Sequence, residues 1–150
     1  KIFIFFILSG LFFSCSKEDE EILEPTTFSE IPEIKFERLE STELKAFHDS
    51  LILYFEYTDG NGDIGFDEPD SSAIYLTETN NNLQESFHIP RLSPPGETVQ
   101  VRGTLKMIYQ DIYIYDDELN EYFTTFKVKI RDRSGNFSNE IETPQIRIYR

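Results

Sequence analysis

The sequence of 150 residues contains one cysteine, two histidines and no tryptophan, and its basic residues are few. A single cysteine cannot form a disulfide within the chain, so the fold must be stable without one. Two histidines without metal-ligand spacing give no zinc signature. Fourteen Lys and Arg side chains against 28 Asp and Glu give a net charge of −14. Such a chain repels nucleic acid and anionic lipid headgroups, so we expect no nucleic-acid partner.

The spacing of apolar residues is not helical, apart from residues 40–47, where one short turn fits the pattern. Apolar and polar residues instead alternate over short stretches, and turn residues separate these stretches. The stretches are 32–40, 50–58, 72–79, 97–109, 122–130 and 141–149. Gly103 interrupts one of them and predicts a β-bulge. The pattern predicts an all-β fold, an immunoglobulin-like antiparallel β-sandwich of about seven strands over residues 31–150.

The chain starts with one lysine and an apolar run over residues 2–13. Twelve residues are too few to span a bilayer, which takes about 20. The run instead matches the apolar core of a secretory signal. We therefore expect a signal peptide over residues 1–14, with one or two residues preceding Lys1 in the gene product. Cys15, the only cysteine, follows this segment directly.

The end of the apolar segment, LFFSC, resembles the lipobox of bacterial lipoproteins, in which the cysteine is lipidated and becomes the mature N-terminus. Phe12 and Phe13 stand where such boxes usually have a leucine and a small residue. The resemblance implies that Cys15 carries a lipid anchor. The alternative for the same residues is an ordinary cleaved signal peptide that leaves a free thiol.

The charged run after the cysteine carries a second resemblance. Lys17, Glu18 and Asp19 are similar to the surface-export signal of Bacteroidetes lipoproteins. This implies an outer-membrane lipoprotein exposed on the cell surface. The alternative is a solvated charge run on a lipoprotein that faces the periplasm. Residues 15–30, which are acidic and contain Pro25, predict a disordered tether between the lipidated cysteine and the domain.

Near the C-terminus, the segment DRSGNFSN resembles the D-x-x-G-N-x-S-N hairpin that closes many bacterial immunoglobulin-like and fibronectin-type domains. Gly-Asn supplies the positive φ angles of a tight turn, and the polar side chains can bond the loop backbone. We expect a structural hairpin that joins strands 122–131 and 140–149. Its key residues are Asp132, Gly135, Asn136, Ser138 and Asn139.

The segment TDGNGDIGFDEPD, residues 58–70, gathers five carboxylates among three glycines. Oxygen-bearing side chains fall at positions 1, 3, 5, 9 and 12 of a calcium-loop spacing. The loop departs from an EF-hand, because Ile64 stands where that loop has glycine and no helices are expected beside it. Hard oxygen ligands favour calcium over softer metals. The predicted ligands are Asp59, Asn61, Asp63, Asp67 and Asp70.

The sequence around this loop offers no counter-charge. No Lys or Arg lies between Lys45 and Arg91, whereas nine acidic residues do. Two carboxylates about 4 Å apart repel by about 1 kcal/mol in water, and a divalent cation relieves that repulsion. We therefore predict a structural calcium ion, and the alternative is a surface turn whose charges stay hydrated. The longer segment YTDGNGDIGF resembles one found in small uncharacterised Bacteroidetes lipoproteins. This resemblance implies a cellular location and a fold but no activity.

Catalytic motifs are missing from the sequence. It has no phosphate loop, nucleophile elbow or dinucleotide fingerprint, and neither His48 nor His88 lies in a recognisable motif. We expect a membrane-anchored, non-enzymatic lipoprotein that acts as a cell-envelope binding or accessory module. The alternatives are a periplasm-facing structural lipoprotein of envelope assembly and a small carboxylate-dependent hydrolase.

Aromatic residues flank the acidic turn DDELN and predict a surface patch for an extracellular glycan or protein partner. These residues are Tyr113, Tyr115, Tyr122 and Phe123.

Overall fold

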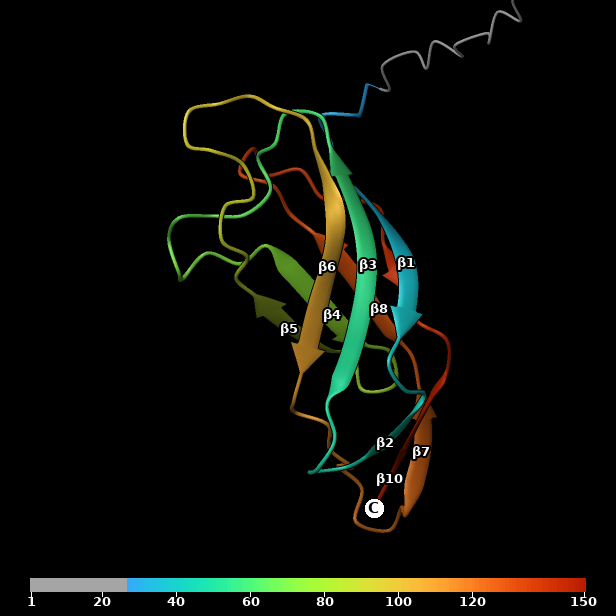
Figure 1. Cartoon of the computed structure of the whole chain (residues 1–150). Helices are drawn as coiled ribbons and strands as arrows, with labels where there is room; N and C mark the ends of the chain where they lie inside the picture. Colours follow the sequence, from blue (N-terminus) through green and yellow to red (C-terminus); the bar gives the residue numbers. More distant parts are fainter. Residues whose placement is uncertain (1–26) are drawn as a thin grey trace, which may run out of the picture.

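The computed structural model describes residues 27–150 and places ten strands in them (Figure 1). The predicted signal peptide, Cys15 and the export signal at residues 17–19 lie outside the described residues. Residues 27–150 contain no helix long and apolar enough to cross a membrane. The strands are β1 (Glu33–Leu39), β2 (Glu43–Lys45), β3 (Leu51–Asp59), β4 (Ile74–Glu78), β5 (Leu83–Phe87), β6 (Val101–Tyr109), β7 (Glu121–Thr124), β8 (Phe126–Ile130), β9 (Ile141–Glu142) and β10 (Ile146–Tyr149).

Several of the ten strands are parts of longer ones. Only Thr125 separates β7 from β8, and these two strands pair with β10 and β9 respectively. The predicted C-terminal hairpin is therefore present, with each of its arms divided between two sheets. β1 and β2 likewise form one segment, which pairs first with β3 and then, in parallel, with β10. Counted in this way the domain has seven strands, in agreement with the sequence.

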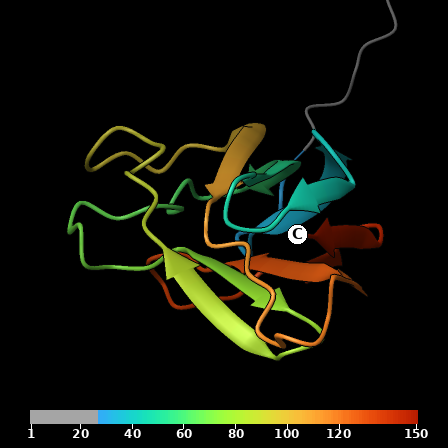
Figure 2. The same cartoon turned by 90° about the horizontal axis from the view of Figure 1, so that it is seen from below.

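The order of the strands is that of an immunoglobulin-like sandwich, which confirms the predicted fold class. One sheet has the order β1–β3–β6, and the sheet that faces it has the order β5–β4–β8–β9. A third, small sheet, β2–β10–β7, continues the second one toward the C-terminus. Figure 2, seen from below, shows the two sheets as separate layers. The parallel pair β2–β10 is a departure from the purely antiparallel arrangement that we expected.

The short-range expectations were less accurate than the fold class. Residues 43–45 form β2 although the pattern allowed a helical turn there, because pairing with β10 satisfies their backbone. The prediction of a bulge at Gly103 is wrong, since β3 pairs with β6 without interruption from Leu51 to Asp59. A register shift lies instead in β1, between Phe36 and Arg38. Strand β5 was not expected, because its residues are mostly exposed and show no alternation.

The core follows the predicted alternation along the strands. Every second side chain is buried from Leu51 to Phe55 on β3 and along all of β8, where Lys127 and Lys129 point to the outer face. Burial of one large apolar side chain contributes about 1.5–3 kcal/mol. The buried residues of these two strands include Leu51, Leu53, Phe55, Phe126, Val128 and Ile130. The two central strands therefore hold the sheets together.

Tyr122 makes a contact that is characteristic of this fold. It lies on β7, just after the loop from β6, and its hydroxyl points at the carbonyl of Tyr113 at 3.0 Å. A tyrosine that bonds back to the backbone of the preceding loop is the tyrosine corner of immunoglobulin-like sandwiches. The same hydroxyl lies 2.9 Å from Glu78 Oε1, so one proton is shared between two acceptors. Burial is the main cause that raises the pKa of Tyr122 above its ordinary value, and the bond to Glu78 adds to it.

The connections gather at the two ends of the sandwich. The loop after β3 and the turn between β8 and β9 lie at the same end as the first described residues (Figure 1). The amide of Gly60 donates to the carbonyl of Ser29 at 2.6 Å, so contacts with the domain begin before residue 31. The C-terminus and the loop between β6 and β7 lie at the opposite end.

Candidate metal site

The loop at residues 59–66 folds inward rather than projecting as a surface turn. Asp59 ends β3 with no exposed surface, and Ile64 is also fully buried. Ile64 forms a β-bridge with Asp132 of the C-terminal hairpin, and the amide of Phe66 donates to the carbonyl of Ile89 at 2.9 Å. The loop is therefore packed between segments that are far apart in the sequence, which argues against a turn whose charges are all hydrated.

Two glycines allow this packing. Gly62 and Gly65 have φ angles of +70° and +84°, which residues other than glycine rarely adopt. A Cβ atom on Gly62 would overlap the carbonyl oxygen of Val99, and one on Gly65 would overlap that of Pro90. The glycines of the motif are thus explained by close backbone approach, independently of any metal.

Two aspartates of the loop each have one carboxylate oxygen bonded and one left over. Asp59 Oδ2 accepts from the amide of Asp63 at 2.8 Å. Asp63 Oδ2 accepts from the hydroxyl and the amide of Ser134, at 2.6 and 3.2 Å. The Oδ1 atoms of Asp59 and Asp63 are buried and have no hydrogen-bond partner among residues 27–150. An unsatisfied buried acceptor of this kind costs about 1–3 kcal/mol, and more when it is charged.

Burial raises the pKa of Asp59 above its ordinary value. The amide of Asp63 opposes this shift, whereas the negative charges of Asp63 and Asp132 add to it. The ionised form of Asp59 is therefore disfavoured in the folded protein until a donor or a cation meets its free oxygen.

Arginines from other segments supply part of the counter-charge that the local sequence lacks. Arg91 binds Asp67 through two hydrogen bonds of 2.6 and 3.1 Å. Arg133 donates to the carbonyl oxygens of Gly65 and Gly62, at 2.8 and 3.2 Å. Within residues 27–150, neither guanidinium forms an ion pair with the two aspartates that have free oxygens.

The structure brings three of the five predicted metal ligands together. Asn61 lies beside Asp59 and Asp63, since its Oδ1 accepts from the Asp63 amide at 3.3 Å. Asp67 is turned toward Arg91, and Asp70 is exposed.

Asp132 comes close to the same cluster, although the sequence assigned it to the hairpin alone. No local spacing could have signalled this, because the hairpin is far from the loop in the sequence.

The carboxylates do not form a complete ligand set by themselves. Within the described chain, no three His, Cys, Asp or Glu side chains form a group that could hold a metal ion. Calcium takes six to eight oxygens, including amide and backbone carbonyl oxygens and water. A cation at this site would therefore be held by Asp59 and Asp63 together with neutral oxygens, of which Asn61 offers one.

The hairpin residues lie where the sequence placed them. Gly135 has a φ of +90°, and Asp132 is fully buried. Its two oxygens accept from the amide and the side chain of Asn136, at 2.7 and 2.9 Å. Asn139 exchanges two bonds of 2.8 Å with the backbone of Ile34, which fixes the hairpin to β1. Ser138 accepts from the amide of Ile130 at 3.0 Å.

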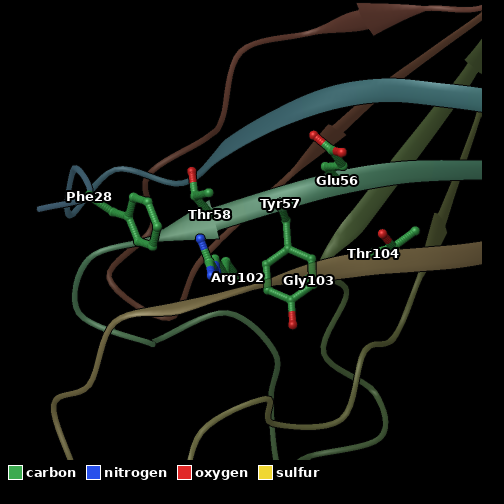
Figure 3. Close-up of a pocket in the computed structure, with 7 residues that line it drawn as sticks. All are labelled: Phe28, Glu56, Tyr57, Thr58, Arg102, Gly103 and Thr104. Atoms are coloured by element: carbon green, nitrogen blue, oxygen red, sulfur yellow. The ribbon is translucent and has the colours of Figure 1, made fainter. Parts of the chain in front are cut away.

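A groove of about 410 Å³ beside the end of β3 is a second candidate site (Figure 3). Tyr57 lies over Gly103 of β6, where a Cβ atom would be 3.0 Å from the phenol oxygen. The groove is lined by Phe28, Glu56, Tyr57, Thr58, Arg102, Gly103 and Thr104. This lining contains neither histidine nor cysteine, and its carboxylate, Glu56, pairs with Lys35 at 3.9 Å.

The two histidines make local bonds. His48 lies 2.8 Å from Asp49 in an exposed pair, and His88 lies 3.0 Å from the carbonyl of Ser71.

When the chain is compared with protein-family models, with curated proteins and with solved structures, it matches none of them.

Proposed function

We propose that this protein is a lipid-anchored, non-enzymatic β-sandwich of the bacterial outer membrane whose loop at residues 59–66 is stabilised by calcium. It would act as a binding or accessory module of the cell envelope. The observation that carries the calcium site is the pair of buried carboxylate oxygens, Asp59 Oδ1 and Asp63 Oδ1, that have no partner within the described residues.

A divalent cation accounts for these two buried oxygens better than a surface turn whose charges stay hydrated. The two aspartates come from one short loop, each has one buried oxygen, and the arginines that bind other groups of the loop leave both of them without an ion pair. Oxygen donors of this kind, supplemented by amide and backbone carbonyl oxygens, suit calcium rather than zinc or copper. The ligands that we propose are Asp59, Asn61 and Asp63, a smaller set than the sequence predicted.

Calcium at this position would be structural. Asp63 already bonds Ser134 of the C-terminal hairpin, so a cation on Asp63 and Asp59 would link the end of β3 to the turn between β8 and β9. Extracellular calcium modules bind with dissociation constants of about 10⁻⁴ to 10⁻³ M. At 100 times the dissociation constant, binding to the folded state alone adds about 2.7 kcal/mol to the free energy of unfolding.

The proposed cellular location of the protein rests on its sequence. The apolar run at residues 2–13, the cysteine at position 15 and the charges at residues 17–19 resemble the export and lipidation signals of small Bacteroidetes lipoproteins. The described residues nearest to these signals lie at the same end of the sandwich as the proposed calcium loop. We propose that a tether at this end holds the domain close to the outer membrane, on the cell surface.

The calcium site is tested by melting the mature protein in neutral detergent with excess calcium and with chelator. Calcium should raise the melting temperature of the wild type by several degrees. Asp59→Asn should melt at or above the wild type in chelator, because an amide removes the buried unpaired charge, and should not respond to calcium. Asp70→Asn removes one exposed charge from the same segment and should respond like the wild type. An identical melting temperature for the wild type under both conditions would refute the calcium site.

The proposed location on the cell surface is tested with intact cells. Protease added to intact cells should degrade the wild-type protein without lysis, and Cys15→Ser should release the protein from the membrane fraction. Degradation only after lysis would place the protein on the periplasmic face.

A further inference from the structure

The end of the sandwich opposite the proposed calcium loop exposes a row of aromatic side chains. Phe47 is 68% exposed, and its ring centroid lies 5.2 Å from that of Tyr113. Tyr113 in turn lies 6.0 Å from Tyr115, which is 58% exposed. Phe47 also has a φ of +62°, an unfavourable angle for a side chain of this size, and its amide donates to the carbonyl of Ile112. The backbone is thus held in a strained form that leaves an aromatic ring in solvent.

A cavity of about 160 Å³ lies at the Tyr115 end of this row. It is lined by Asn80, Asn81, Ile114, Tyr115, Asp116, Leu119 and Tyr122. Glu78 lies next to it, only 7% exposed, and its carboxylate accepts from Tyr122 and from the side chain of Asn81 at 2.9 and 3.0 Å. The cavity therefore combines an exposed aromatic wall with carboxylates at its rim and beneath it.

The charge around this cavity is negative. Residues 110–121 contain five carboxylates and no Lys or Arg. The fold brings two cations to this segment. Arg150 pairs with Asp117 at 3.3 Å and donates to the carbonyls of Leu119 and Asp116, at 3.0 and 3.3 Å. Arg147 pairs with Glu121 at the end of the segment. Neither Asp116 nor Glu78 has an ion-pair partner among residues 27–150.

We propose that this cavity and the aromatic row bind a basic side chain, arginine or lysine, presented by a partner protein. A guanidinium or ammonium group over the face of a tyrosine gains about 0.5–2 kcal/mol, and a carboxylate beside it adds a charge-assisted hydrogen bond. The charge of the surface complements such a group and repels anionic ligands. The loop between β6 and β7 also lies at the end of the sandwich opposite the first described residues (Figure 1).

This inference gives the proposed binding role its class of partner, and it does not depend on calcium. A neutral glycan is the competing occupant, because aromatic faces and amides also bind sugars. The two differ in their salt dependence, since an exposed ionic contact weakens as salt screens it and a glycan contact does not.

The test measures the binding of fluorescein-labelled hexaarginine and hexalysine to the mature protein in neutral detergent, by anisotropy at low and high salt. Tyr115→Ala should weaken binding about threefold to tenfold, and Asp116→Asn should weaken it as well. Two matched controls should leave affinity unchanged. Phe137→Ala removes an exposed aromatic side chain near the opposite end, and Glu97→Gln removes an exposed charge elsewhere.

Equal losses in the patch variants and the controls would reduce the binding to diffuse attraction between opposite charges and overturn the inference. Competition by neutral maltohexaose or xylohexaose, unaffected by salt, would replace the basic partner with a glycan. The melting shift with calcium is recorded on the same variants. If Tyr115→Ala leaves both peptide binding and the calcium shift unchanged, this inference fails while the calcium site stands.

Discussion

Two loops at one end of the sandwich each contain an aspartate with no exposed surface, and the two aspartates differ in how their carboxylate oxygens are hydrogen-bonded. Asp132 is closed within its own hairpin, because both of its oxygens accept from Asn136. Asp59 has one oxygen bonded by the amide of Asp63 and one that meets no donor in the part of the chain that the structure describes. The first loop is complete as folded, whereas the second has capacity left for a ligand. Burial alone therefore does not mark a binding site; an unmet acceptor does.

The largest effect that we expect comes from Gly62, which lets the second loop pack. Gly62→Ala puts a side chain at positive φ and against the carbonyl of Val99, so it should lower the free energy of unfolding by more than about 3 kcal/mol or prevent folding. Gly96→Ala is the matched control, since Gly96 has a φ of +79° with nothing within 4 Å of the added Cβ. It should cost only about 1–2 kcal/mol. Equal costs in denaturant titrations would show that the loop tolerates the overlap.

The comparison between the two aspartates is sharpest when each is changed. Asp132→Ala removes both acceptors from Asn136 and should lower the free energy of unfolding by about 3 kcal/mol, with or without calcium. Asp59→Asn should show no such loss in chelator. Urea titrations of both variants in chelator decide the point. A large loss in Asp59→Asn would mean that Asp59 is as fully satisfied as Asp132.

A smaller effect should appear in the pH dependence of stability without calcium. Because the folded-state pKa of Asp59 is raised above 3.8, the folded protein keeps a proton that the unfolded chain has released. Stability therefore falls, relative to Asp59→Asn, as pH rises from about 3.8 through the folded pKa, and then levels off. Each unit of pKa shift contributes about 1.4 kcal/mol to this difference. Excess calcium should reverse this stability difference, because it favours the ionised form of Asp59. If the pH curves of the wild type and Asp59→Asn are parallel in chelator, burial does not raise the pKa of Asp59.

The smallest effect concerns Asp67, which the sequence predicted as a ligand. Its pair with Arg91 is on the surface, with side chains 59% and 22% exposed, so Asp67→Asn should cost only about 0.2–1 kcal/mol. The melting shift with calcium should be retained. Loss of that shift, measured by calorimetry, would return Asp67 to the ligand set and break the distinction between the bonded and the free carboxylates.

Much of the fold was accessible from the sequence because a half-buried strand repeats its pattern every two residues. Phe126, Val128 and Ile130 alternate with lysines, and this alone assigned them to a core face. The D-x-x-G-N motif located the last turn for a similar reason, since its geometry depends on adjacent residues. β5 was missed because its side chains are largely exposed and its order comes from pairing with β4.

The candidate site was only partly accessible in the same way. The spacing of Asp59, Asn61 and Asp63 places their oxygens close together through local backbone geometry. The diversion of Asp67 to Arg91 and the contact of Asp63 with Ser134 depend on segments that only the folded chain brings near. The aromatic row likewise joins Phe47 to Tyr113 across more than sixty residues, so its extent could not be read from the segment DDELN.

The sequence by itself determined the two-layer β architecture, the closing hairpin and the strongly negative charge, because each follows from composition or from neighbouring residues. The tertiary structure decided which carboxylates are neutralised and which remain free. The physical reason is that counter-charges and hydrogen-bond donors act over a few ångströms in space, and in this molecule those that matter come from distant strands.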